Sequence, residues 1–150
     1  MSSETFFVVI NPEDKDIGYS VWRNAELFKH GIIKSLKTDD NNVILEHFFN
    51  EINNLFNEYP PTLVVYKNMS KSTASKEYFL LQGMIMAVCV QKKIYFKLLS
   101  ITEWKKTLGC TAKKISNEIL AEQYVKSHYA EKVKDSEAIA ICIGASLCVN

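Results

Sequence analysis

Five polar residues stand where an α/β protein gathers its functional groups. Asn11 follows the first apolar run of the sequence, and Lys67 follows a later one. Lys134, Asp135 and Glu137 open the last helical pattern. If the two runs are neighbouring parallel strands, their carboxyl ends meet at one edge of a sheet, where a packed helix can add side chains. Only Asp135 and Glu137 carry the carboxylates that a divalent metal site needs.

A second group of residues that could do chemistry is a run of lysines between positions 92 and 114. Seven lysines stand there against one acid, Glu103, and the aromatic residues Tyr95, Phe96 and Trp104 are interleaved. A lysine that meets a phosphate releases counterions and positions a nucleic-acid backbone without reading its sequence. A lysine-rich face is also often only solvated, with its aromatic residues in the core. The run therefore predicts either a DNA surface or a solvated face.

The apolar patterns predict the elements that must position these residues. Short β-branched and aromatic runs predict strands, and apolar residues at helical spacing predict helices. The expected order is three strands, helix, strand, helix, strand and three helices, over residues 6–10, 17–22, 25–33, 43–56, 63–66, 72–90, 94–96, 101–108, 115–129 and 136–148. Asp40 is the expected N-cap of the first helix. Strands that alternate with helices after a meander indicate an α/β fold, with a mixed five-stranded sheet flanked by helices on both faces.

The composition is that of an ordinary globular protein. With 150 residues, 47% hydrophobic and 23% charged, the chain is long enough to bury a core, and we expect one domain. The formal net charge of +1 argues against a strongly basic protein, so any DNA surface must be local. No stretch approaches about 18 apolar residues and no signal pattern opens the chain, so we expect a cytoplasmic protein with no membrane partner.

No cysteine, histidine or glycine pattern indicates a metal or nucleotide site. The four cysteines lie in apolar segments without close pairs, and we expect buried reduced thiols. His30, His47 and His128 are isolated in the sequence, and we expect none of them to bind a metal. Five glycines and no glycine-rich turn argue against an actin-like nucleotide-binding domain.

Five segments, in matching order and spacing, resemble the RuvC-like Holliday junction resolvases of the RNase H-like superfamily. The resemblance covers residues 6–148. It is carried by Val9–Pro12 with Ile17–Val21, Gln82–Gly83, Ile101–Lys106 with Leu108–Gly109, Ala112–Lys114 and Glu137–Ile141. In that family the first turn begins with Asp-Pro, where this chain has Asn11-Pro12, and the last helix begins with Asp-Ala, where it has Glu137-Ala138.

The resemblance implies cleavage of four-way DNA junctions with two divalent metals, as in enzymes of DNA recombination. Such a metal pair needs several converging carboxylates. The resemblance places four of them at the positions of Asn11, Lys67, Lys134 and Glu137, so that only Glu137 is retained. We therefore expect a pseudo-nuclease that has no bound metal. We also expect the Lys67 ammonium to stand where a metal would and to contact Glu137 directly or through Asn11.

Several alternatives stay open. Asp135, or loop acids such as Glu13, Asp14 and Asp16, could restore an active Mg²⁺-dependent endonuclease, although loop acids are more often simply solvated. An engineered Asp-to-Asn change could explain Asn11 but not Lys67. The same fold could also serve as a protein-interaction scaffold.

The resemblance also implies partners. It places the lysine run near DNA, so we favour contact with branched DNA over a solvated face. The lysines expected to bind DNA are Lys71, Lys76, Lys105, Lys106, Lys113 and Lys114. Resolvases of this type are dimeric, so we expect a homodimer, with the long helix 72–90 as a candidate interface.

Overall fold

A computed structural model describes residues 5–13, 16–68, 76–100, 102–133 and 135–149. The elements occur in the order expected from the sequence. They are β1 (Phe6–Pro12), β2 (Asp16–Arg23), β3 (Glu26–Lys34), α1 (Asn41–Glu58), β4 (Pro61–Asn68), α2 (Lys76–Lys92), β5 (Tyr95–Ser100), α3 (Glu103–Leu108), α4 (Asn117–Tyr129) and α5 (Asp135–Leu147). This confirms the expected α/β fold.

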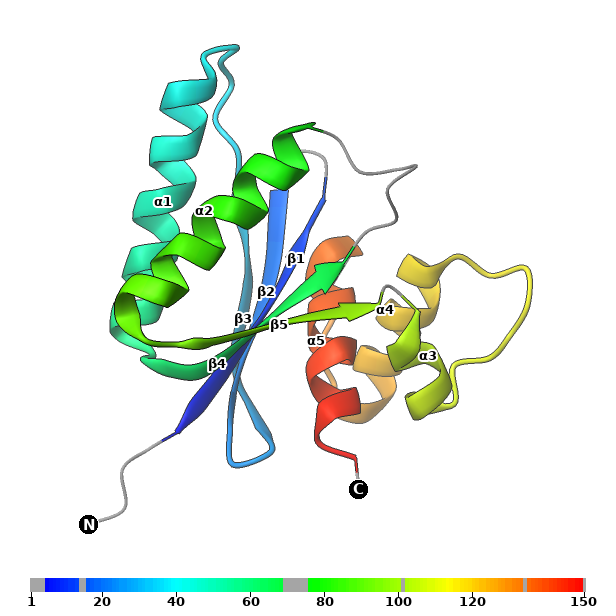
Figure 1. The fold of residues 1–150 in the computed structure, drawn as a ribbon. Coiled ribbons are helices and arrows are strands. Elements are labelled where there is room, and N and C mark those ends of the chain that lie inside the picture. Colours follow the sequence, from blue (N-terminus) through cyan, green and yellow to red (C-terminus); the bar gives the residue numbers. More distant parts are fainter. Residues whose placement is uncertain (1–4, 14–15, 69–75, 101, 134, 150) are drawn as a thin grey trace.

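The strands form one mixed sheet in the order β3-β2-β1-β4-β5 (Figure 1). β1 pairs antiparallel with β2, which pairs antiparallel with β3, so the first three strands form the expected meander. β4 joins the other side of β1 in parallel, and β5 pairs parallel with β4. β1 and β4 are therefore adjacent parallel strands, and their carboxyl ends lie at one edge of the sheet, as the sequence predicts.

The side chains of β1 alternate between two hydrophobic cores, because successive residues of a strand point to opposite faces. Val8 and Ile10 belong to the core that includes Ile52 of α1. Val9 belongs to the other core, together with Ile139 of α5. Helices α1 and α2 cover the first face, and α3, α4 and α5 lie on the second (Figure 1). The expected coverage of both faces is confirmed.

Helix α5 approaches the strands unusually closely, because small residues face it. A Cβ placed on Gly18 would lie 2.2 Å from the carbonyl carbon of Ser136. The Ser20 hydroxyl donates to the Ala140 carbonyl at 2.7 Å and accepts from the Trp22 indole N–H at 2.8 Å. The packing therefore holds the start of α5 against β2 and, through β2, beside the end of β1.

Capping residues determine several helix ends, and some of these ends differ from the predicted ones. Asp40 caps α1 as expected, since its carboxylate accepts from the backbone N–H of Asn42 at 3.0 Å. Ser116 caps α4 in the same way through Ile119, so this helix starts at Asn117 and not at residue 115. α3 ends at Gly109, whose φ of 75° suits glycine. The expected first residues of the long helix, 72–75, lie outside the described residues.

None of the described helices has the length and apolar character needed to cross a lipid bilayer. The four cysteines are unpaired thiols, of which Cys89 and Cys142 are buried. Burial raises the pKa of Cys89 to about 11 and that of Cys142 further, so both thiols stay protonated at neutral pH.

Candidate functional site

The ends of β1 and β4 meet the first turn of α5, as the sequence predicts. Ile10 pairs with Tyr66 in the ladder between β1 and β4, so Asn11 and Lys67 are the next residues of the two strands. Asn11 is fully buried, and its amide nitrogen donates to the Ser136 carbonyl at 2.9 Å. This bond joins the end of β1 to the start of α5.

Lys67 points into this region and not into solvent. Only 12% of its side chain is exposed, and its Nζ lies 3.7 Å from Oε1 of Glu13. The predicted contact between Lys67 and Glu137 is therefore wrong, because Glu13 is the partner of Lys67. Val9 and Val65 lie in the same core, so Asn11 and Lys67, two residues further along each strand, share that face, and Glu13, just after the end of β1, contacts Lys67 there.

The description of Glu13 as a solvated loop acid is also wrong. Its Oε1 is buried and, among the described residues, has no hydrogen-bond partner. Burial raises the pKa of Glu13, the negative charge of Glu118 raises it further, and the Lys67 ammonium and Asn11 lower it in part. Asn11 Oδ1 is likewise buried, with no hydrogen-bond partner in the described part of the chain. Glu13 thus forms a half-buried ion pair with Lys67.

Glu137, the one carboxylate that the resemblance retains, contacts His30, a histidine that is isolated in the sequence. Nδ1 of His30 is hydrogen-bonded to Oε2 of Glu137, and its Nε2 lies 3.9 Å from Oε2 of Glu131. His30 pairs with Ser20 across the ladder between β2 and β3. Cross-strand partners share a face, and Ser20 bonds to α5, so His30 also faces α5.

Two residues of the predicted set do not join this cluster. Asp135 is exposed at the first residue of α5, with a φ of 52° that Asp tolerates better than most residues. Lys134 lies outside the described residues. We call the cluster of Asn11, Glu13, Lys67, His30 and Glu137 the strand-end site.

The strand-end site does not fit the two divalent metals that the resemblance implies. An ammonium lies beside Glu13, and Glu137 is paired with His30. Within the ranges that the structure describes, no three His, Cys, Asp or Glu side chains are grouped so that they could hold a metal ion. A metal pair would have to displace Lys67 and break the His30–Glu137 pair before it found enough anionic ligands.

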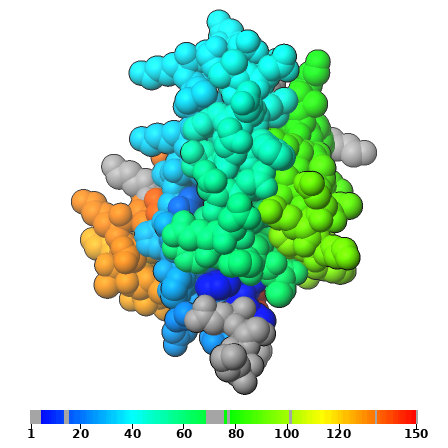
Figure 2. Space-filling model, turned by 90° about the vertical axis from the view of Figure 1, so that its left-hand side faces the viewer, coloured from blue at the N-terminus to red at the C-terminus, as the bar shows by residue number. Residues whose placement is uncertain are grey.

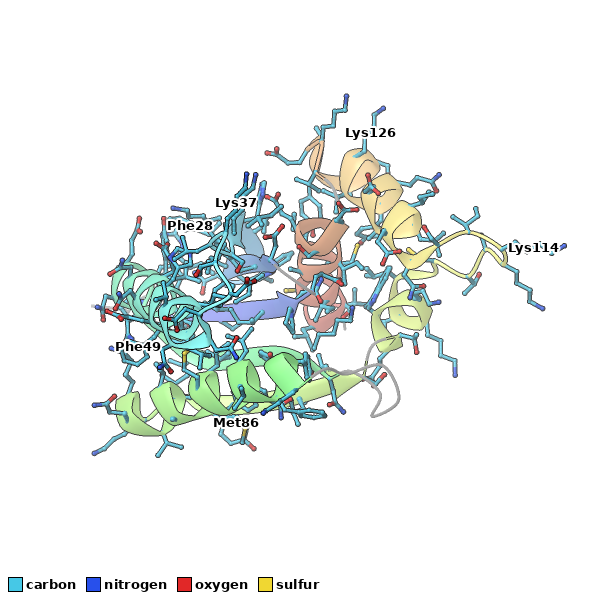
Figure 3. The ribbon with its side chains drawn as sticks, turned by 90° about the horizontal axis from the view of Figure 1, so that it is seen from above. Phe28, Lys37, Phe49, Met86, Lys114 and Lys126 are labelled. Atoms are coloured by element: carbon cyan, nitrogen blue, oxygen red, sulfur yellow. The ribbon has the colours of Figure 1, made fainter. Side chains whose placement is uncertain are left out.

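The lysines of α3 and of the loop that follows it lie on the face of the sheet that carries the strand-end site, whereas Lys92 and Lys93 precede β5, at the opposite end of the strands. The loop 109–116, which we call the arm, projects from the body between α3 and α4, with Lys114 far from the sheet (Figures 1 and 3). Lys106, Lys113 and Lys114 are exposed, and Lys105 is half-buried. We call these four lysines the basic surface. Lys76 is exposed at the start of α2, and Lys71 lies outside the described residues.

The aromatic residues of the lysine run have different surroundings. Trp104 is buried in the core under α5, and Phe96 packs against the core on the other face. Tyr95 is 72% exposed at the start of β5. The core interpretation therefore holds for Trp104 and Phe96 and not for Tyr95.

The arm is joined to the strand-end site through α4. Ser116 ends the arm and caps α4, and Glu118 follows in the first turn of this helix. Glu118 lies near enough to Glu13 to raise its pKa. The first turn of α4, which follows the arm, therefore lies on the face of the sheet that carries the Lys67–Glu13 pair.

No protein-family model and no curated protein matches this sequence. Thermus thermophilus RuvC in complex with a Holliday junction substrate is similar in structure, with a TM-score of 0.73 and 11% identity, over 95% of this chain and 91% of that one. The yeast mitochondrial Holliday junction resolvase Ydc2 has a TM-score of 0.65 and 11% identity, over 95% and 77%. The fowlpox virus resolvase, in complex with Holliday junction DNA, has a TM-score of 0.58 and 13% identity, over 96% and 97%.

The likeness extends over nearly the whole chain at 11–13% identity and shows which fold the chain adopts. It confirms the structural resemblance that the five sequence segments indicate. The chain therefore has the fold of the RuvC-like Holliday junction resolvases.

Proposed function

We propose that this chain binds branched, four-way DNA and does not cut it. The observation that carries the proposal is the half-buried Lys67–Glu13 pair, because it puts an ammonium at the end of β4, where a resolvase of this fold is expected to need a carboxylate. The remaining strand-end groups are engaged within the protein. Asn11 bonds to Ser136, and Glu137 bonds to His30.

The absence of cleavage follows from the charge of the strand-end site. Two divalent ions generate the attacking hydroxide and stabilise the leaving oxygen, and they need several convergent anionic ligands. Breaking the Lys67–Glu13 pair to admit a metal would leave a half-buried charge without its partner. Metal binding is therefore opposed by the free energy needed to break the Lys67–Glu13 ion pair of the folded protein.

The fold and the basic surface together support DNA binding. Two of the similar structures are resolvases in complex with junction DNA. In this chain the exposed lysines of α3 and the arm project beside the strand-end site. α1, in contrast, contains acids and no lysine or arginine, so the DNA would lie on the side of the arm.

We further propose a homodimer that forms through the outer face of α2. Phe79, Leu80, Met86 and Val90 are exposed on this helix, with Val90 79% exposed. The sequence between Glu77 and Lys92 contains no charged residue. Figure 2 shows α1 and α2 side by side on one face, and Figure 3 shows Met86 on the outer side of α2. A two-fold dimer would cover this apolar face and match the repeated arms of a four-way junction.

One observation favours the alternative of an active, metal-dependent endonuclease. The buried oxygens Asn11 Oδ1 and Glu13 Oε1 lack hydrogen-bond partners among the described residues, as ligands awaiting a cation would. In that case Asn11 and Glu13 would be among the residues that hold Mg²⁺. The apolar face of α2 also leaves open a protein-interaction scaffold, for which failure to bind any branched DNA at low salt would be the evidence.

A gel-shift and cleavage assay on a synthetic four-way junction separates these functions. We expect binding to the junction in preference to duplex DNA of equal length, and no nicks with EDTA, Mg²⁺ or Mn²⁺. Metal-dependent nicking that is lost in Glu13→Gln or Glu137→Gln would refute the pseudo-nuclease and establish the endonuclease. Sedimentation of the parent and of a Met86→Lys, Val90→Lys variant tests the dimer, which the variant should dissociate.

A further inference from the structure

We propose that the Lys67 ammonium binds a backbone phosphate of the DNA strand directly, without a metal, and that Glu13 competes with the phosphate for it. The ligand is a phosphodiester group of a branched DNA substrate. The inference rests on the proposed DNA binding and names the residues that carry it at the strand-end site.

The backbone of Lys67 is held firmly at the end of β4. Its carbonyl accepts a hydrogen bond of 2.6 Å from the Tyr78 hydroxyl of α2. The side chain lies on the same face of the sheet as Asn11 and Glu13, and it keeps 12% exposure. The ammonium is therefore placed at the edge of the sheet while it retains a path to solvent.

The pairing with Glu13 does not saturate this ammonium. An Nζ–Oε1 separation of 3.7 Å is that of an ion pair and exceeds the usual length of a hydrogen bond. An ammonium has three N–H donors, and a carboxylate oxygen 3.7 Å away leaves donors that a phosphate oxygen can accept from. A phosphate that approaches from the open side can therefore share Lys67 with Glu13.

The position of Lys67 makes it continuous with the basic surface. Glu118, in the turn that follows the arm, interacts electrostatically with Glu13. β4 ends toward the side on which α4 and the arm lie (Figure 1), so a DNA strand that follows the arm toward the sheet would pass the end of β4, where Lys67 lies. Lys67 then extends a row of phosphate contacts into the region where a metal-dependent relative would act.

The test is the affinity of a fluorescent four-way junction for the full chain in EDTA, measured by anisotropy from 50 to 200 mM salt. The loss of one phosphate contact makes the plot of log affinity against log salt less steep by about 0.9. At 0.15 M salt the same loss weakens binding by about five-fold. We expect this from Lys67→Gln. Glu13→Gln should bind about two-fold tighter, because it removes the competing charge. Because a misfolded variant would not bind more tightly than the parent, tighter binding by Glu13→Gln would show that a substitution at this ion pair does not unfold the protein.

A second ion pair supplies matched controls. Lys29 Nζ lies 3.9 Å from Glu58 Oε1, on β3 and α1. Lys29→Gln and Glu58→Gln make the same chemical changes away from the strand-end site and should leave the affinity and the slope unchanged.

The outcomes separate the inference from the proposed function. If the parent binds and Lys67→Gln keeps its affinity and slope, the inference is overturned and DNA binding stands. It is also overturned if Mg²⁺ restores the affinity of Lys67→Gln, because a metal ion could then bind the phosphate in place of the ammonium. If the parent binds no junction at any salt concentration, the proposed function fails and this inference fails with it.

Discussion

The basic surface gives the most quantitative prediction, which is the effect of removing its four charges together. If about six lysine–phosphate contacts form, changing Lys105, Lys106, Lys113 and Lys114 to Gln removes four of them, and Lys67, Lys71 and Lys76 remain as candidates for the other two. Three of the four are exposed and one is half-buried, so the substitutions leave the core intact. The variant should therefore fold as the parent does.

Each contact contributes about 0.9 to the salt slope. For six contacts, a rise from 50 to 200 mM salt should weaken junction binding by about 10³-fold, whereas two contacts give only about ten-fold. At 0.15 M salt the variant should bind about 10³-fold more weakly than the parent. Fluorescence anisotropy titrations at four salt concentrations measure the slope and the affinity together.

The matched control removes four exposed lysines elsewhere: Lys34, Lys37, Lys126 and Lys132. It lowers the net charge equally, so it should weaken binding much less if the contacts are local (Figure 3 marks Lys37 and Lys126 away from the arm). Equal weakening by the control would mean that only the net charge matters. A variant of the basic surface with the parent's slope would show that these lysines are merely solvated.

Three further predictions concern stability. Gly18→Ala should lower the free energy of unfolding by about 1–3 kcal/mol, because the new Cβ meets the backbone of Ser136. Gly83→Ala should raise it by about 0.5–1 kcal/mol, because Gly83 has open space around it in α2. Urea titrations measure both changes. The raised pKa of Glu13 means that its charged form opposes folding, so stability is lost as pH rises through that pKa. Glu13→Gln should therefore lose this pH dependence, measured as the melting temperature between about pH 4 and 8, while it leaves the Lys67 ammonium without its partner; the same pH dependence in parent and variant would contradict this. Mg²⁺ at millimolar concentration should leave the parent's melting temperature unchanged, since a ligand stabilises only the state that binds it, and a rise of several degrees would revive the metal site.

The element order and the sheet were predictable because each element has a local signature. The apolar runs of β1 and β4 are too short for helices and are nearly continuous, as strands buried on both faces are. β5 was predicted too short, as residues 94–96, because Lys97 breaks the apolar run of an edge strand. Hydrogen bonding to β4 continues to Ser100 regardless of that side chain.

The strand-end site was predictable only in part. Asn11 and Lys67 follow recognisable strands, so their meeting could be inferred from a parallel arrangement. Glu13 could have been found, because the alternation Val9–Asn11–Glu13 continues past the apolar run. His30 could not, since its partner Glu137 lies 107 residues away and the meeting depends on the register of β3 on β2.

The close approach of α5 to the first strands also has a consequence for how the chain is made. The hydrogen bonds from Asn11 and Ser20 reach across 125 and 120 residues. During synthesis, β1 and β2 leave the ribosome long before α5, so one face of the sheet stays uncovered until α5 emerges. A ribosome that stalls before residue 135 would hold a nascent chain with Val9 and Trp22 exposed, and this chain would be a target for chaperones and proteases. The strand-end site can consequently assemble only after α5 has emerged and packed against β1 and β2.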